Sequence, residues 1–214
     1  MGLRSLSEFI WIEISWNADS SRIVQIESPA NKEGESTLAK QIHYGLKGMS
    51  LIDIKQKGFD RVVEFHFALR PKDESKRLLI VELMGRHSNL FFLNQQKQVI
   101  TIGKQVRESQ SKLRPISTGD QYISPPPLKS LAPNQKEPYE RWKETLSLLP
   151  INLGKALQQN YQGMSPSLTR QLASDNKLTA DKILDMNVHK ISKEDWQRLY
   201  IRWSKWLKDL DTEN

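Results

Sequence analysis

Hydrophobic and polar residues alternate through the first half of the chain, a pattern that is typical of short strands. The β-branched and aromatic runs 9–16 and 22–27 flank the turn Asn17-Ala18-Asp19-Ser20-Ser21, and this arrangement predicts a hairpin. The same pattern predicts further strands over residues 49–54, 61–69, 76–84, 88–93 and 99–102.

One segment departs from this strand pattern. Leu38, Ile42 and Leu46 recur at helical spacing, and they predict a helix over residues 36–47 that stops at Gly48. Because turn residues separate the short strands around it, we expect an antiparallel meander or sandwich with one inserted helix.

The pattern changes after Gly103. Residues 115–133 are rich in Pro, and they predict a linker without packed elements. Beyond the linker the apolar spacing is helical, with helices expected over 138–148, 151–160, 166–175, 179–185 and 192–210. The expected fold class is α+β, with an antiparallel β-rich domain over residues 1–125 and an all-α domain over residues 135–214.

The last of these helices carries a regular apolar stripe. Its members are spaced by three and four residues: Trp196, Leu199, Trp203, Trp206 and Leu210. Such a stripe is more typical of a core helix with large buried side chains, and the alternative is the root of a coiled coil. The spacing leaves both alternatives open.

Charge and composition narrow the choice of partners. The 214 residues carry a formal net charge of +7, which favours a polyanionic partner without requiring one. Because the sequence contains no Cys, it excludes a disulfide framework, a Cys-based zinc site and a thiol nucleophile. No apolar run approaches the ~20 residues of a membrane helix. We therefore expect a cytoplasmic protein without membrane contact.

The sequence contains no recognisable catalytic constellation. His43, His66, His87 and His189 are scattered and lack metal-ligand spacing, and a hydrogen-bonded structural role is the simpler expectation for His66. A nucleophile elbow, a Walker loop and a dinucleotide-binding glycine motif are absent. We expect no catalytic residue, metal, cofactor or small-molecule substrate, and so a protein that is not an enzyme.

Two polar stretches at the ends of predicted strands are candidate binding residues. Asp60 and Arg61 precede one strand, and an Asp beside an Arg can orient the planar guanidinium toward a phosphate or a base edge. The alternative is a surface ion pair worth ~0–1 kcal/mol.

The second stretch, Gly85-Arg86-His87-Ser88-Asn89, connects two predicted strands. Arg86, His87, Ser88 and Asn89 supply charge, a stacking ring and hydrogen-bonding groups, which suit RNA backbones and unpaired bases. The alternative is a hairpin turn in which Ser and Asn act as turn formers.

Two further segments can contact phosphate. A basic strip is formed by Lys104, Arg107, Lys112 and Arg114, against Glu108 as the one acidic residue of the segment, and it suits nonspecific phosphate contacts. The turn Gly163 to Leu168 precedes a predicted helix, whose first N–H groups can face a phosphate.

These motifs, taken in order, resemble the N-terminal region of the NFACT family, the ribosome-quality-control group that includes bacterial RqcH proteins and is often labelled fibronectin-binding protein A. The similar segments are Phe59-Asp60-Arg61, Glu82-Leu83-Met84-Gly85-Arg86-His87-Ser88-Asn89, residues 114–126 with Arg114, Gly119, Tyr122, Pro125 and Pro126, and Gly163-Met164-Ser165-Pro166. Together they span residues 59–168, and the combination is specific although each motif is short.

The resemblance implies a factor that binds tRNA on obstructed large ribosomal subunits and takes part in alanine tailing of blocked nascent chains. It implies a β-rich domain similar to DNA glycosylases of the MutM type, followed by a helix-hairpin-helix domain, and it implicates Asp60 and Arg61 in tRNA binding. The alternatives are a glycosylase-like DNA-binding protein and a fibronectin-binding adhesin. The glycosylases use an N-terminal proline amine, whereas Gly2 follows Met1 here.

The chain also departs from the family pattern. Full-length members begin with a further helix and strand upstream of the hairpin at Phe9, and they continue into a long coiled coil and a second conserved domain. We therefore expect a truncated or partial member, in which residues 192–210 lead toward the coiled coil.

Overall fold

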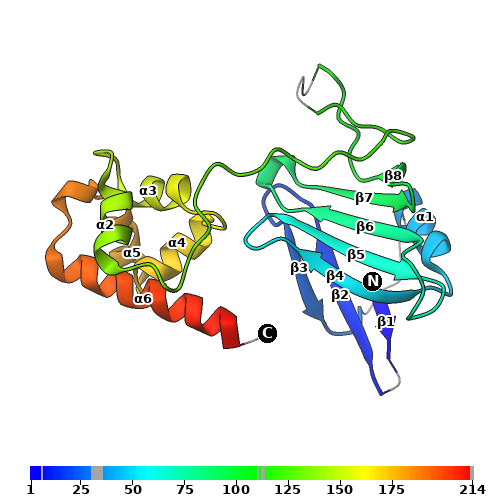
Figure 1. Cartoon of the computed structure of the whole chain (residues 1–214), viewed down its shortest axis with the longest axis horizontal. Helices are drawn as coiled ribbons and strands as arrows, with labels where there is room; N and C mark the ends of the chain where they lie inside the picture. Colours follow the sequence, from blue (N-terminus) through cyan, green and yellow to red (C-terminus); the bar gives the residue numbers. More distant parts are fainter. Residues whose placement is uncertain (6, 30–35, 110, 112–113, 213–214) are drawn as a thin grey trace. The chain divides into compact units, whose positions relative to one another are not determined.

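The computed structural model describes residues 1–5, 7–29, 36–109, 111 and 114–212 (Figure 1). The chain divides into two compact units. The first contains residues 1–57 and 61–126, and the second contains residues 58–60 and 127–214. The sequence pattern did not predict that the short segment 58–60 packs with the second unit.

Two antiparallel sheets build the first unit (Figure 1). The predicted hairpin is confirmed as two strands of a three-stranded sheet, which has the order β1 (Gly2–Arg4), β2 (Phe9–Ser15) and β3 (Arg22–Ile26). The predicted meander is confirmed as a five-stranded sheet in sequence order, formed by β4 (Ser50–Gln56), β5 (Val62–Ala68), β6 (Arg77–Glu82), β7 (Asn89–Asn94) and β8 (Val99–Ile102). The three-residue strand β1 was not predicted, because it is too short to show a period.

Both faces of the five-stranded sheet are covered within this unit. On one face Phe65, Leu79 and Phe92 lie in register on β5, β6 and β7, and they pack against the three-stranded sheet and helix α1 (Thr37–Leu46). On the other face, apolar residues of β6 to β8 pack against Ile116 and Tyr122. The alternation of side chains along each strand therefore supplies two separate cores.

Helix α1 begins and ends as the sequence predicts. The Ser36 hydroxyl caps it by accepting a hydrogen bond from the Ala39 N–H, and Gly48 follows it in the left-handed region, with φ +77. Gly45 lies directly against the Phe92 ring, so that a Cβ atom there would overlap the ring. The helix is nevertheless shallow, because none of its residues is fully buried.

The prediction that residues 115–133 lack packed elements is wrong. Ile116 and Tyr122 are 3% and 6% exposed in the core of the first unit, and Ile116 forms a bridge with Val106. Leu131 forms a bridge with Tyr161 in the second unit. Isolated apolar residues between prolines show no period in the sequence, so their burial gave no signal there.

The second unit is helical. Its elements are α2 (Tyr139–Ser147), α3 (Leu153–Asn160), α4 (Pro166–Ala173), α5 (Lys177–Asp185), the short 3-10 helix η2 (Val188–Lys190) and α6 (Lys193–Thr212). They agree with the predicted helices to within a few residues at each end. Within the described ranges, no helix is long and apolar enough to cross a membrane.

The apolar stripe of α6 lies in the core of this helical unit. Trp196, Leu199 and Trp203 are buried, and Trp203 contacts the rings of Trp142 and Tyr161. The next stripe residue, Trp206, is half-buried against Phe59, and Leu210 is exposed. The first part of the stripe therefore serves as core, whereas its continuation into a coiled coil stays a prediction.

Candidate nucleic-acid interface

Several loops with cationic residues meet where the strands of the five-stranded sheet begin or end. We refer to this row of strand ends as one edge of the sheet. Because neighbouring strands are antiparallel, the start of β5, the end of β6, the start of β7 and the end of β8 lie at the same edge. The register pairs Val62 with Glu82, and Glu82 with Asn89. The residues that follow or precede these strand ends form what we call the cationic edge, consisting of Arg61, Arg86, His87 and Lys104.

The loop of the cationic edge between β6 and β7 is held by its own buried polar side chains. Gly85 adopts φ +55 and begins the 3-10 helix η1 (Gly85–His87). The Ser88 hydroxyl accepts a hydrogen bond from the Met84 N–H at 2.8 Å. Since Ser88 is 1% exposed, it serves the fold of the loop.

Asn89 fastens the same loop to the residue after β8. Its Oδ1 accepts a hydrogen bond from the Lys104 N–H at 2.8 Å, and its Nδ2 donates to the Lys104 carbonyl at 2.7 Å. Asn89 is 3% exposed. The Asn89 side chain thus forms hydrogen bonds with the Lys104 backbone in place of backbone pairing between the strands. It supports the site, but its polar atoms are not available to a ligand.

Arg86 and His87 carry the exposed side chains of the loop. The Arg86 Nε donates a hydrogen bond to the His87 Nε2 at 3.1 Å. This contact leaves the two terminal nitrogens of the guanidinium as the groups that can approach an anion.

Arg61 joins the cationic edge through the main chain. Its carbonyl accepts a hydrogen bond from the Leu83 N–H at 2.8 Å, which places the half-buried Arg61 beside the end of β6. The division between the two units falls between Asp60 and Arg61.

The residues of the predicted basic strip do not form one exposed surface. Lys104 and Arg107 are exposed, and the Lys104 ammonium donates a hydrogen bond to the Trp16 carbonyl at 3.3 Å. Lys112 lies outside the described residues. The Arg114 side chain is only 16% exposed, because it turns into the unit.

Arg114 is the centre of a buried ionic network. Its Nη1 and Nη2 donate to the two carboxylate oxygens of Glu82 at 2.8 and 2.5 Å, and its Nε donates to the Ile123 carbonyl at 2.7 Å. The Tyr122 hydroxyl donates to the same carboxylate at 2.8 Å. The guanidinium also lies 5.4 and 5.2 Å from the ring centres of Phe91 and Tyr122.

The electrostatics of this network indicate a structural role. Burial raises the pKa of the Tyr122 hydroxyl, and the neighbouring Glu82 raises it further. Burial lowers the pKa of Arg114, but the contact with Glu82 outweighs this effect and leaves the pKa raised. Because its donors are engaged inside the unit, we assign Arg114 to the fold. Sequence reasoning missed Glu82 and Tyr122 as its partners, although a lone acid within an apolar strand was a signal.

The remaining polar candidates serve local structure. At the start of α4, Ser165 accepts a hydrogen bond from the Leu168 N–H, and Pro166 has no N–H to offer. The His66 Nε2 lies 3.1 Å from a carboxylate oxygen of Glu64, in agreement with a hydrogen-bonded histidine. Across the part of the chain that the structure describes, no three His, Asp or Glu side chains gather as a metal site.

Comparison with known proteins identifies the family. The family model described as NFACT N-terminal and middle domains matches residues 1–214. The chain belongs to this family. Its membership agrees with the motifs between residues 59 and 168.

Relatives from Streptococcus suis and Bacillus subtilis carry the name Rqc2 homolog RqcH. The protein from Streptococcus suis is 33% identical over 156 residues, which cover 72% of this chain and 28% of that protein. The protein from Bacillus subtilis is 30% identical over 146 residues, which cover 65% of this chain and 25% of that protein. The chain therefore matches only about a quarter of the length of these ribosome-quality-control relatives.

Solved structures confirm the α+β fold. The N-terminal region of the fibronectin/fibrinogen-binding protein from Streptococcus suis has a TM-score of 0.62 and 25% identity, over 94% of this chain and 71% of that chain. The N-terminal domain of the fibronectin-binding protein PavA from Streptococcus pneumoniae has a TM-score of 0.62 and 26% identity, over 85% of this chain and 69% of that chain.

Proposed function

We propose that the chain is a non-catalytic RNA-binding part of a cytoplasmic ribosome-quality-control factor, and that it binds tRNA on obstructed large ribosomal subunits. The observation that carries this proposal is the convergence of Arg61, Arg86 and Lys104, from three separate segments, at one edge of a rigid sheet. Phosphates follow one another along an RNA backbone, so several cations at one edge suit it better than a single surface charge.

Each residue of the cationic edge has a distinct part in this proposal. Arg86 offers its terminal nitrogens to a phosphate or a base edge, and His87 holds the guanidinium and offers a ring for stacking. Ser88 and Asn89 act by fixing the loop. Arg61 is proposed to contact tRNA with the help of the neighbouring carboxylate of Asp60, and Lys104 and Arg107 to add nonspecific phosphate contacts.

Two finer parts of the proposal rest on the family resemblance. The helix-hairpin-helix character of residues 135–214 is supported by residues 161–165, which contain Gly163 and connect two short helices, α3 and α4. Participation in alanine tailing is proposed only for the whole factor, because this chain corresponds to 28% or less of the RqcH relatives described above.

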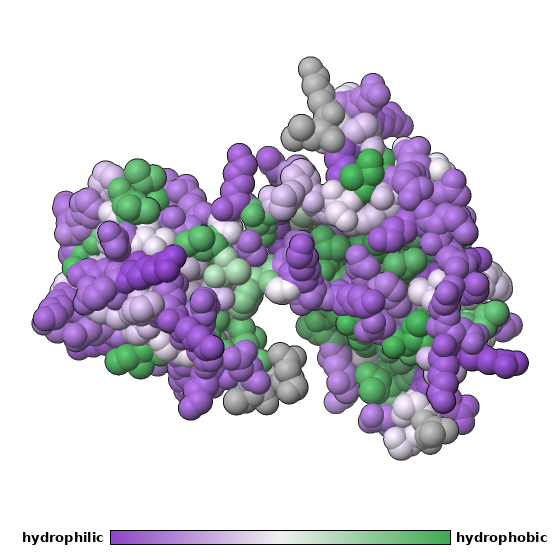
Figure 2. Space-filling model, in the orientation of Figure 1, coloured by the Kyte–Doolittle hydropathy of each residue, from purple (hydrophilic) through white to green (hydrophobic). Residues whose placement is uncertain are grey.

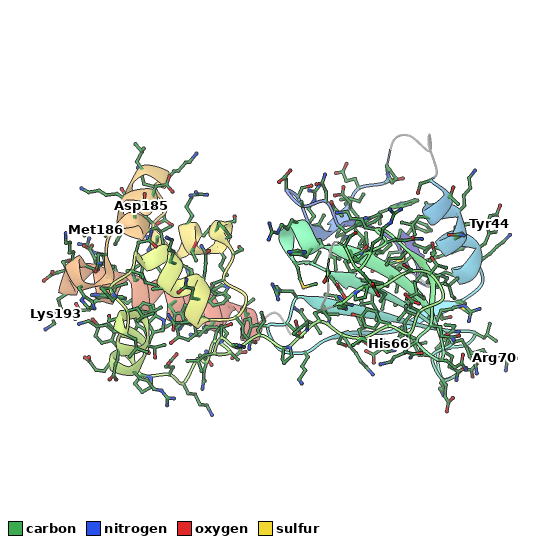
Figure 3. The ribbon with its side chains drawn as sticks, turned by 90° about the horizontal axis from the view of Figure 1, so that it is seen from above. Tyr44, His66, Arg70, Asp185, Met186 and Lys193 are labelled. Carbon is green, nitrogen blue, oxygen red and sulfur yellow. The ribbon has the colours of Figure 1, made fainter. Side chains whose placement is uncertain are left out.

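Filter binding of tRNA at two salt concentrations tests the proposal. We expect Arg86→Ala to weaken binding by ~1–3 kcal/mol and to reduce the salt slope by about one, because a guanidinium contact and its released counterion are lost. Arg70→Ala is the matched control, since Arg70 is exposed in the β5–β6 turn at the opposite edge of the same sheet (Figure 3). Equal affinities of the two variants would contradict the proposal.

Fibronectin binding is the second candidate function, because solved relatives carry that name. Immobilised fibronectin offered to the wild-type chain at physiological salt distinguishes the two. Saturable binding to fibronectin together with absent tRNA binding supports the second candidate and rejects the first. A duplex containing an abasic site, offered in the same assay, tests the glycosylase-like alternative.

A further inference from the structure

The turn between β4 and β5 carries residues that serve two different units. The two strands pair as far as Gln56 with Val63. Within the turn, residues 58–60 pack with the helical unit, whereas Arg61 belongs to the β-rich unit. The chain therefore contributes three residues to the helical unit before β5 begins.

Phe59 fixes this turn within the helical unit. Its ring centre lies 5.8 Å from that of Trp206 on α6. A Cβ atom at Gly163, which has φ +77, would lie 3.3 Å from the Phe59 Cδ1, so a residue without a side chain suits this position. The visible face of the helical unit is mainly hydrophilic, with separate apolar side chains (Figure 2). An aromatic ring has few apolar partners on such a surface, and the packing of Phe59 is therefore a specific contact.

Arg61 is held from the other direction along the chain. Its carbonyl accepts the hydrogen bond from the Leu83 N–H at 2.8 Å, and the next residue begins β5. Only Asp60 separates Arg61 from Phe59, so their Cα atoms can be at most ~7 Å apart. Because so short a link has little slack, a displacement of Phe59 changes the backbone of Asp60 and Arg61.

We propose that Phe59 is a positioning residue for Arg61, through which the folded helical unit keeps Asp60 and Arg61 in place for RNA. This inference rests on the RNA-binding function proposed above for the cationic edge. Ordering the backbone of a residue costs conformational entropy. The packing of Phe59 offsets that cost when the helical unit folds, so that RNA meets an Arg61 whose backbone is already ordered.

Arg86 provides an internal comparison for this proposal. Its loop is fixed by hydrogen bonds from the Met84 N–H to Ser88 and between Asn89 and the Lys104 backbone. All of these residues belong to the β-rich unit. The contact of Arg61 with RNA should therefore depend on Phe59, whereas the contact of Arg86 should not.

Hydrogen exchange of the Leu83 amide tests the positioning in the absence of RNA. We expect Phe59→Ala to speed this exchange roughly tenfold, because the Arg61 carbonyl that accepts the bond is no longer held in place. Trp206→Ala removes the partner ring from α6 and should have the same effect. Ile201→Ala is the matched control, since Ile201 lies on the same helix and is 65% exposed. Unchanged Leu83 exchange in both Phe59→Ala and Trp206→Ala would overturn the proposal, whatever the affinity for RNA.

A double-mutant cycle measured by filter binding of tRNA tests the same residue in RNA binding. We expect Phe59→Ala to weaken binding by about tenfold in the wild-type chain and in Arg86→Ala, but to have no further effect in Arg61→Ala. Phe59→Tyr keeps the ring and should restore the wild-type affinity. An equal loss in the Arg61→Ala background would show a general structural effect and would reject the positioning role.

Two controls separate this result from folding and from the proposed function. Circular dichroism shows which variants are folded, and Phe59→Leu replaces Phe59→Ala if the latter loses its helices. A wild-type chain that binds no tRNA would reject the RNA-binding function. In that case the exchange of the Leu83 amide still decides whether Phe59 positions Arg61.

Discussion

At the scale of single residues, the carboxylate of Glu82 shows how the family motifs contribute to the fold. It follows four apolar residues at the end of β6, and it is 1% exposed. Arg114 and Tyr122 satisfy both of its oxygens from a segment that would otherwise have little regular structure. A buried charge of this kind is tolerated only while its partners remain, so the three residues act as one unit.

Removal of Arg114 should therefore be severe. We expect Arg114→Ala to lower the free energy of unfolding by roughly 3–5 kcal/mol, because Glu82 is left buried without a counterion. The double variant Glu82→Gln with Arg114→Met should recover a large part of this loss, because the buried charge is removed as well. Urea denaturation measures both. A single variant as stable as the double one would contradict the assignment.

Two buried tyrosines predict alkaline sensitivity. Burial raises the pKa of Tyr122 and of Tyr161 above the ordinary value of 10.0, and hydrogen bonds to Glu82 and Glu137 raise it further. A group whose pKa is raised by folding contributes stability below its unfolded pKa and loses it as the pH rises. We expect the free energy of unfolding to fall above about pH 10. Tyr122→Phe should make this fall shallower in urea titrations between pH 8 and 11, and an unchanged slope would contradict the role of Tyr122.

At the scale of elements, two glycines within helices, Gly45 and Gly154, allow a controlled comparison of the same substitution. A Cβ at Gly45 of α1 would overlap the Phe92 ring, whereas a Cβ at Gly154 of α3 would meet its nearest neighbour at 3.5 Å, an ordinary contact. We expect Gly45→Ala to destabilise the protein by ~1–3 kcal/mol. Gly154→Ala should stabilise it by up to about 1 kcal/mol, because Ala favours the helix. Thermal denaturation of both variants compares them, and a stabilising Gly45→Ala would show that α1 has room to move.

The sequence predicted elements well where a period or a cap was present. Leu38, Ile42 and Leu46 with the stop at Gly48 gave α1, and the alternating runs gave the meander. Antiparallel order in turn brings the loops of Arg61 and Arg86 to one edge. The pattern failed at β1, which is too short for a period, and at Tyr122, whose burial depends on partners far away in the chain.

Only the exposed residues of the candidate site could be predicted from the sequence. Composition identified Arg86, His87, Ser88 and Asn89 together, yet the structure buries Ser88 and Asn89. Their partners are the Met84 N–H and the Lys104 backbone, and the second of these lies on another strand end. Residue type therefore indicates hydrogen-bonding capacity, but the fold decides whether that capacity is used internally or offered to a ligand.

At the scale of the whole molecule, the helical unit depends on three residues from the middle of the β-rich sequence. Phe59 is half-buried against Trp206, with ring centres 5.8 Å apart, and it lies over Gly163. We expect Phe59→Ala to destabilise this unit by about 2 kcal/mol. Hydrogen exchange should show faster exchange in α6 with unchanged protection in β5 to β7. The control Phe9→Ala changes an exposed ring and should leave α6 unaffected.

The position of Phe59 in the sequence also limits when the helical unit can fold during synthesis. During synthesis Phe59 emerges before any helix of the helical unit exists, whereas Trp206 is added only after helices α2 to α5. The helical unit can therefore be completed only after α6 has been synthesised, and the Phe59 ring lacks its aromatic partner until then. A nascent chain that stops before α6 would leave this ring exposed to water.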